Sequence, residues 1–140
     1  MKVIIDTNKI ISSLIKEGIS RKILFNKNFE FFTPEYSTSE IQEHKSEIIE
    51  KTHLNDDGFE ILLSLIFERI SIISGDEYKP FFEKSKKLIS DPDDVSFIAA
   101  SLAIKADGIW SDDYHFLEQN ELKILKTKEM VDLMGNFEEL

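Results

Sequence analysis

The sequence contains no cysteine and few glycines, and these shortages exclude several kinds of chemistry. Without cysteine among its 140 residues, the chain forms no disulfide, no thiolate metal site and no cysteine nucleophile. The five glycines are not clustered, so a glycine-rich phosphate-binding loop is absent. The Gly-x-Ser-x-Gly signature of serine hydrolases is missing as well. The chemistry of this chain must therefore come from other residue types.

Long apolar segments are also missing. No run of eighteen apolar residues occurs, and no basic segment is followed by an apolar one, so we expect neither a membrane protein nor a secreted one. The lack of cysteine is compatible with a cytoplasmic location, which we expect. The formal net charge of −10 argues against a broad surface for binding polyanions. It does not exclude a nuclease, because a divalent cation held by carboxylates reverses the local charge toward phosphate.

Strands and helices are expected to alternate, which indicates an α/β fold with a mostly parallel sheet. Short apolar runs predict strands at Met1–Ile5, Phe29–Thr33, Ile70–Ile73, Gly108–Trp110 and Leu122–Leu125. Apolar spacing and capping residues predict helices around Ile10 to Ile15, at Arg21–Lys27, from Ser37 or Thr38 to about Lys51, from Asn55 or Asp56 through Phe67, near Tyr78–Ile89, after Asp91 and after Thr127. We see no repeat and no linker, so residues 1–140 are expected to form a single domain.

The segment from Asp91 to Phe116 has the clearest pattern in the chain. Asp91 is a suitable N-cap and Pro92 suits the first helical position, and the helix that follows is apolar around much of its circumference. That helix leads into a short buried strand. Ligands in this fold class bind beyond the carboxyl ends of the strands, which makes Asp94 and Asp113 candidate site residues.

Four acids are expected to meet at one edge of the sheet. Asp6 follows the first strand and Asp113 follows the fourth, while Glu40 and Asp94 lie in the first turns of helices. Right-handed crossovers bring such positions together where the strand order reverses, between the first and fourth strands. Carboxylates in close quarters either bind a cation or hold a proton. Mg²⁺ and Mn²⁺ prefer oxygen ligands and orient water for attack on phosphate, so a metal site is one interpretation.

Each acid also has a structural interpretation as a helix cap. Ser37-x-x-Glu40 and Asp91-x-x-Asp94 both resemble capping boxes. Asp6 or Thr7 suits the start of the first helix, and Asp113 suits the turn that begins at Tyr114. The physics of single residues leaves the two interpretations open. It also does not separate Asp112 from Asp113, or Glu43 from Glu40, which lies three residues earlier near the same helix face.

The four acids lie in motifs that together resemble the PIN domain, the nuclease fold of many VapC-type toxins. The resemblance covers essentially the whole chain, with the motifs in the family's order. They are Val-Ile-Ile-Asp6-Thr-Asn8, then Glu40 early in the third helix, then Asp-Pro-Asp-Asp94-Val-Ser-Phe-Ile-Ala-Ala, and finally Ile-Trp-Ser111-Asp-Asp113-Tyr-His-Phe116.

The resemblance implies a three-layer α/β/α fold and Mg²⁺- or Mn²⁺-dependent endonucleolytic hydrolysis of RNA. The metal would be held by Asp6, Glu40, Asp94 and Asp113. Asn8 and Ser111 would be polar groups beside it, with Glu43 and Asp112 as alternative ligands. Two residues depart from the family pattern: Ser111 stands where threonine is commoner, and Asp112 where asparagine or a basic residue is common. The motif spacing favours Asp113 over Asp112.

Partners are also suggested by the sequence. The first quarter is the most basic part of the chain, so Lys9, Arg21 and Lys22 are candidate RNA contacts, with a solvated surface as the alternative. The apolar segment Ile61–Ile70 is either core or part of a homodimer interface. The family resemblance implies an RNA substrate and the toxin role in a type II toxin–antitoxin pair, with an antitoxin partner. The alternative is a catalytically silent PIN-fold binding or dimerisation module.

The three histidines are interpreted as surface or turn residues rather than as ligands. His44, His53 and His115 are scattered, and none forms a His-x-x-x-His pair.

Overall fold

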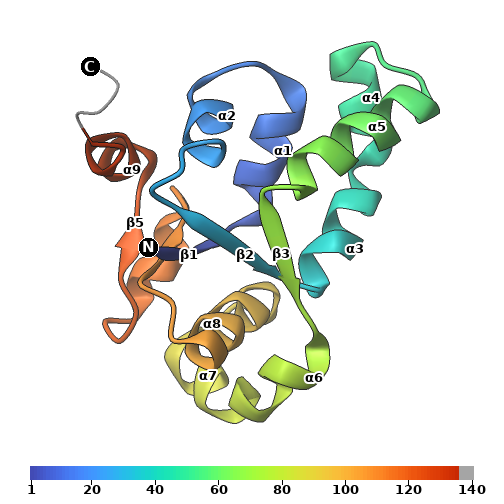
Figure 1. The fold of residues 1–140 in the computed structure, drawn as a ribbon. Helices are drawn as coiled ribbons and strands as arrows, with labels where there is room; N and C mark the ends of the chain where they lie inside the picture. The colour runs from blue at the N-terminus through green and yellow to red at the C-terminus, as the bar shows by residue number, and fades with distance from the viewer. Residues whose placement is uncertain (136–140) are drawn as a thin grey trace.

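A five-stranded parallel sheet forms the centre of residues 1–135, the part of the chain that the computed structural model describes (Figure 1). The strand order is β3-β2-β1-β4-β5, and every strand pair is parallel. The strands are β1 (Lys2–Ile5), β2 (Glu30–Pro34), β3 (Ile70–Ile73), β4 (Gly108–Trp110) and β5 (Ile124–Leu125). The predicted α/β fold is confirmed. Residues 136–140 of the predicted domain lie outside the described residues.

Helices cover both faces of this sheet (Figure 1). On one face lie α1 (Thr7–Ile15), α2 (Ile19–Leu24), α3 (Tyr36–Glu43), α4 (Lys45–Thr52), α5 (Asp56–Phe67) and α9 (Thr127–Leu133). On the other lie α6 (Gly75–Tyr78), α7 (Phe82–Leu88), α8 (Pro92–Ile104) and the 3₁₀ turns η1 (Lys79–Phe81) and η2 (Tyr114–Glu118). These three layers match the predicted α/β/α architecture.

Both faces of the sheet are buried, and the strand sequences show why. Val3 and Ile5 belong to one buried core, while Ile4 between them belongs to the core on the opposite face. In β4, Trp110 and Ile109 divide in the same way. Successive side chains of a strand point to opposite faces, so a strand covered on both sides needs a continuous apolar run. The short apolar runs of the sequence therefore form strands that are buried on both faces of the sheet.

The strand order reverses between β1 and β4, as predicted. These strands pair in register up to Ile5 and Trp110, and the N–H of Asp6 then donates to the Trp110 carbonyl at 3.1 Å. The chain leaves the sheet directly after this pair, at Asp6 on one strand and Ser111 on the other. The predicted site residues thus begin from two adjacent strand ends.

Several helix boundaries differ from the prediction. The helix expected from Ser37 or Thr38 to Lys51 is two helices, α3 and α4, because the chain turns at His44, whose Nδ1 lies 2.8 Å from the Glu40 carbonyl. The helix expected near Tyr78–Ile89 is divided into α6, η1 and α7, and Pro80, which has no N–H to donate, lies at the division.

Three smaller boundaries also move. The predicted helix Arg21–Lys27 is α2, which begins directly after Gly18 and ends at Leu24. Only Ile124 and Leu125 of the predicted last strand pair with β4, because the N–H of Leu122 is held in a turn by Gln119 Oε1 at 2.7 Å. Thr127 is the first residue of α9 rather than its cap.

Only part of the segment Ile61–Ile70 packs into the core. Ile66 and Ile70 are buried, whereas Ile61 is 64% exposed and Leu65 48% exposed. Ile72 on the edge strand β3 is 50% exposed. In residues 1–135, no helix has the length and apolar character needed to cross a membrane.

Candidate active site

Asp6 and Asp113 are joined through a buried hydroxyl. Ser111 Oγ donates to Asp6 Oδ2 at 2.7 Å and accepts the N–H of Asp113 at 3.0 Å. Asp6 occupies the N-cap position of α1, but its side chain makes no capping hydrogen bond. Asp113 does cap η2, because one of its oxygens accepts the N–H of His115 at 2.9 Å. The cap interpretation therefore holds for Asp113 and is wrong for Asp6.

Glu40 is brought to the same place by a second pair of hydroxyls. Thr7 Oγ1 donates to Glu40 Oε1 at 2.7 Å, and its single proton is then used, so Ser37 Oγ donates to Thr7 across 2.8 Å. Because α3 begins at Tyr36, Glu40 is its fifth residue rather than part of its first turn, and Ser37 lies inside the helix. The capping box predicted for Ser37 and Glu40 is not formed. The Glu40 carboxylate is instead tied to the residue that follows Asp6.

Asp94 enters from α8 on the other face of the sheet. Its side chain is only 9% exposed, and its Oδ2 has no hydrogen-bond partner among the described residues. Asp91 caps α8 by accepting the N–H of Asp93 at 2.9 Å, so Asp94 is not needed as a cap. A buried carboxylate oxygen without a partner is costly unless a proton or a cation satisfies it.

The electrostatics of the cluster point the same way. Burial, and then the neighbouring charges of Asp91, Asp113 and Asp6, raise the pKa of Asp94 to about 7. Burial is also the main cause that raises the pKa of Asp6, and Asp113 adds to it. The pKa of Glu40 is raised by burial and then by Asp6 and other nearby acids. These acids repel one another, and carboxylates in such surroundings are stabilised by a proton or by a cation.

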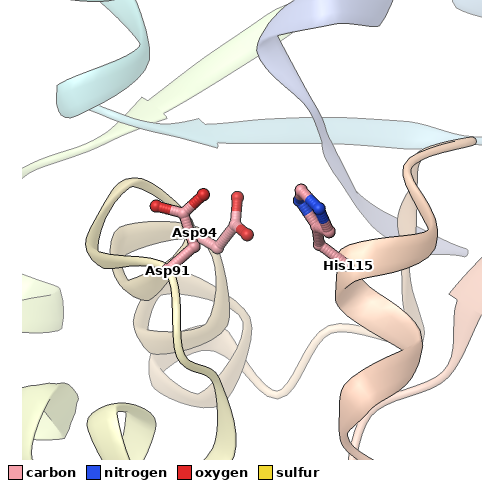
Figure 2. Close-up of side chains that lie close together, drawn as sticks. All are labelled: Asp91, Asp94 and His115. Atoms are coloured by element: carbon pink, nitrogen blue, oxygen red, sulfur yellow. The ribbon is translucent and has the colours of Figure 1, made fainter.

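The most compact ligand set in the structure, however, is one that sequence reasoning missed. It consists of Asp91, Asp94 and His115 (Figure 2). Their ligand atoms lie within 4.8 Å of one another, and no other group of three or more metal-ligating side chains in residues 1–135 meets this distance. The four predicted acids are spaced more widely than that. Asp91 had been interpreted only as a cap and His115 only as a turn residue. Nothing in their sequence spacing signals that α8 and η2 bring them together.

Asp112 is turned away from the predicted site. Burial alone would raise its pKa, but the ammonium of Lys9 and hydrogen bonds from Thr127 outweigh burial and hold the pKa below its usual value. Asp112 Oδ1 accepts the N–H of Thr127 at 2.8 Å, and Oδ2 accepts the Thr127 hydroxyl at 2.6 Å. Asp112 therefore contributes to capping the N-terminus of α9. The choice of Asp113 as the fourth acid stays a prediction.

The remaining candidates lie at the margin of the cluster. Asn8 and Glu43 are exposed, and Glu43 is close enough for its charge to act on Glu40. Tyr36 at the start of α3 donates to Asp93 Oδ1 at 2.7 Å, and this bond is the main cause that raises the pKa of Tyr36. Tyr36 and Asp93 thus join α3 to α8 beside the acids.

Two of the three predicted RNA contacts have structural partners. Lys9 pairs with Asp112. Arg21 donates through Nε and Nη2 to the Ser13 carbonyl, at 2.9 and 2.6 Å, and so closes the end of α1. Lys22 is exposed, and within the described residues its side chain makes no hydrogen bond or ion pair.

The raised pKa of Asp94 predicts a pH-dependent stability in metal-free protein. Its folded pKa of about 7 lies above the value of about 3.9 expected when unfolded, so stability should fall as pH rises from about 4 through 7. Asp94→Asn removes this loss. At pH 8 in EDTA the variant should melt several degrees higher than the parent, and the difference should shrink toward pH 4. Asp57→Asn, an exposed control, should follow the parent; parallel profiles for parent and Asp94→Asn would contradict the assignment.

Comparison with known proteins adds a family and a fold. A model of the PIN domain family matches residues 4–133. The crystal structure of VapBC2 from Rickettsia felis, bound to a DNA fragment from their promoter, contains a chain with a TM-score of 0.64 and 17% sequence identity; the match covers 90% of this chain and 98% of that one. At this identity the likeness is one of fold. A comparison with curated protein sequences gives no match.

Proposed function

Because the chain belongs to the PIN domain family, we propose that it is a Mg²⁺- or Mn²⁺-dependent endoribonuclease and the toxin of a type II toxin–antitoxin pair. The observation that carries the proposal is the buried Asp94 Oδ2, which has no partner among the described residues and belongs to a carboxylate whose pKa Asp6 and Asp113 help to raise. Close carboxylates that repel one another give a scaffold no stability. A site that holds a divalent cation needs its carboxylates close together, because the cation offsets their repulsion.

In this proposal the cation is held by Asp6, Glu40, Asp94 and Asp113. When bound, Mg²⁺ or Mn²⁺ supplies a polarised water and offsets charge on the phosphate. Ser111 and Thr7 are positioning residues, because their hydroxyls orient the carboxylates of Asp6 and Glu40.

Glu40 is the acid that we propose for proton transfer. It is only partly buried, so its carboxylate can reach an attacking water and take a proton from it. Thr7 steadies one oxygen of Glu40 and leaves the other for that task.

The proposed function is tested with a mixed pool of single-stranded and structured RNA. The metal-free protein is assayed with Mn²⁺, Mg²⁺ or EDTA, and its melting temperature is recorded in the same buffers. We expect cleavage with either metal, none in EDTA, and a rise in melting temperature of several degrees with millimolar Mn²⁺. Metal-induced stabilisation should disappear in Asp94→Asn.

A catalytically silent binding or dimerisation module is the second candidate. It is favoured by the exposed apolar side chains Ile61, Leu65 and Ile72, which suit an interface. Folded protein that cuts no RNA and is not stabilised by Mn²⁺ or Mg²⁺ would favour this module over the enzyme.

Ser111 offers a separate test of how the acids are oriented. Ser111→Ala removes the hydroxyl that joins Asp6 to Asp113, and we expect cleavage to fall about 10- to 100-fold. Ser111→Thr keeps the hydroxyl and should retain most of the activity. The pH–rate profile should move in Ser111→Ala, because the carboxylate of Asp6 loses a donor that favours its charged form. An alanine variant with the parent's rate and profile would exclude this positioning role.

For RNA binding we retain Lys9 and Lys22 as contacts, since Lys22 is exposed and Lys9 lies beside the site. Arg21 is assigned to the end of α1 instead. Phosphate contacts act without regard to sequence, so Lys22→Ala should weaken binding to all RNAs alike and reduce its dependence on salt.

We also propose a homodimer, an antitoxin partner and a cytoplasmic location. The apolar side chains Ile61, Leu65 and Ile72 support the dimer, which measurement of the molar mass in solution tests directly. The antitoxin is supported by the likeness in fold to a chain of the VapBC2 structure. Co-purification with the product of a neighbouring gene tests that partner.

A further inference from the structure

We propose that Asp91, Asp94 and His115 form a second cation position, which shares Asp94 with the first and takes a transition-metal ion in preference to Mg²⁺. The ligand atoms of these three side chains lie within 4.8 Å of one another, and Figure 2 shows the two carboxylates beside each other, across from the imidazole. The inference deepens the proposed function, on which it rests for the role of Asp94 in the first position. It concerns binding and can be tested without any activity.

The spacing suits a single ion. Ligands that bind one ion at 2.0–2.2 Å lie up to about 4.4 Å apart, so the observed set needs only a small contraction. His115 is exposed on η2 and can make that movement, whereas Asp94 is fixed in the first turn of α8.

The two aspartates are held on one side of α8. The N–H of Asp94 donates to the Asp91 carbonyl at 3.0 Å, which closes the first turn and stacks the two side chains three residues apart. Asp91 Oδ1 accepts the N–H of Asp93, while its Oδ2 has no partner among the described residues. Asp94 Oδ2 is buried and also lacks a partner there. Each aspartate therefore has an oxygen to offer a cation.

The distance between α8 and η2 is fixed by a separate contact. Ser90, the residue before Asp91, donates its hydroxyl to Glu118 of η2 at 2.9 Å, and its N–H donates to the same carboxylate. These residues and the three ligands line an open cavity of about 240 Å³. The cavity leaves room for an ion and its waters without repacking the core.

The imidazole determines which cations fit. Mg²⁺ takes oxygen ligands almost exclusively, whereas Zn²⁺ and Mn²⁺ accept a histidine nitrogen beside carboxylates. Asp113 contacts the same imidazole, with its Oδ1 3.3 Å from Nδ1 of His115. Histidines that bind a metal commonly have a carboxylate beside the other ring nitrogen. Asp113 thus contacts His115 directly and links the two positions.

The test follows the histidine ring signals of the full-length protein by ¹H–¹⁵N NMR while Zn²⁺ is added to metal-free samples. We expect the ring signals of His115 to shift and those of His53 to stay in place. Asp91→Ser keeps a capping side chain but removes the carboxylate, and should weaken the Zn²⁺ response of His115 at least about tenfold. His53→Asn, the matched control, should leave that response unchanged. In Asp6→Asn, which disrupts the first position, Mg²⁺ at the same concentrations should not shift His115.

Other results would overturn the inference. Zn²⁺ that leaves His115 unmoved, or that shifts it equally in the parent and Asp91→Ser, would exclude this position. An equal shift with Mg²⁺ in Asp6→Asn would exclude the selectivity. In Asp6→Asn, which disrupts only the first position, the Zn²⁺ response should persist; if RNA is never cut but this response is present, the nuclease fails and the second position stands.

Discussion

Replacing Asp6 by asparagine is expected to reduce RNA cleavage about a thousandfold. In the proposed function Asp6 helps to hold the metal, so losing its carboxylate removes several kcal/mol of transition-state stabilisation, and each 1.4 kcal/mol is tenfold in rate. The variant should fold normally. Burial already raises the pKa of Asp6, so the ionised carboxylate costs stability in metal-free protein, and an amide avoids that cost. Its carbonyl still accepts from Ser111 Oγ. We therefore expect an inactive protein whose metal-free melting temperature is no lower than that of the parent.

The matched control is Asp112→Asn. Asp112 is the residue directly before Asp113, yet its carboxylate contacts Lys9 and Thr127. We expect this variant to lose some stability, because α9 loses part of its cap, and to cut RNA within about tenfold of the parent. Cleavage is measured for both variants with Mn²⁺ at one pH, beside their melting curves. If Asp6→Asn cuts RNA as well as the parent, the carboxylate cluster is not the active site.

Part of this site could be predicted because local rules determine it. A buried strand followed at once by Asp6, and a capped helix leading to Gly108–Trp110, both place polar residues at strand ends. The parallel order of the sheet then brings Asp6 beside Ser111 without any knowledge of distant contacts. Apolar periodicity and capping residues were therefore sufficient to predict at which edge of the sheet these residues meet.

The partners of each side chain could not be predicted in the same way. Asp112 and Asp113 are adjacent and identical in type, and their difference arises because α9 returns to place Thr127 against Asp112. The sequence predicts a helix cap for Thr7, yet its hydroxyl donates a hydrogen bond to Glu40, thirty-three positions later in the chain. Long-range contacts of this kind depend on packing, which a local pattern does not display.

The same limit applies to Asp91 and His115. Each satisfies a local rule, one as a helix cap and the other in a turn, and a satisfied local rule gives no reason to seek another role. Only the position of η2 against the start of α8 shows that their ligand atoms converge.

Trp110→Ala is expected to lower the free energy of unfolding by about 3–5 kcal/mol, the range for removing a fully buried large aromatic side chain. Trp110 is completely buried and packs against Phe31 with ring centroids 5.6 Å apart. Its Nε1 donates to Thr127 Oγ1 at 3.0 Å, so the indole also supports the start of α9. Domains of this size have only about 5–15 kcal/mol of stability, so the variant should be partly unfolded near its working temperature. Urea unfolding followed by circular dichroism measures the change.

Two controls separate packing from the hydrogen bond. Trp110→Phe keeps most of the ring and loses the N–H, and should cost less than the alanine variant because the core is still filled. Tyr114→Ala, which truncates an aromatic side chain that is 74% exposed, should change stability by no more than about 0.5 kcal/mol. Equal losses for Trp110→Ala and Tyr114→Ala would contradict the burial that the structure assigns to Trp110.

The position of Trp110 extends the expected effect to the site. Its carbonyl accepts the N–H of Asp6, and the next residue is Ser111, whose hydroxyl joins Asp6 to Asp113. A cavity at Trp110 should loosen this strand end before the whole domain unfolds, since packing there holds both backbones in register. In Trp110→Phe, which remains folded, we therefore expect Mn²⁺ to raise the melting temperature almost as much as in the parent. Trp110→Ala, assayed below its own melting temperature, should respond less, because its carboxylates are no longer held at the spacing that a cation requires.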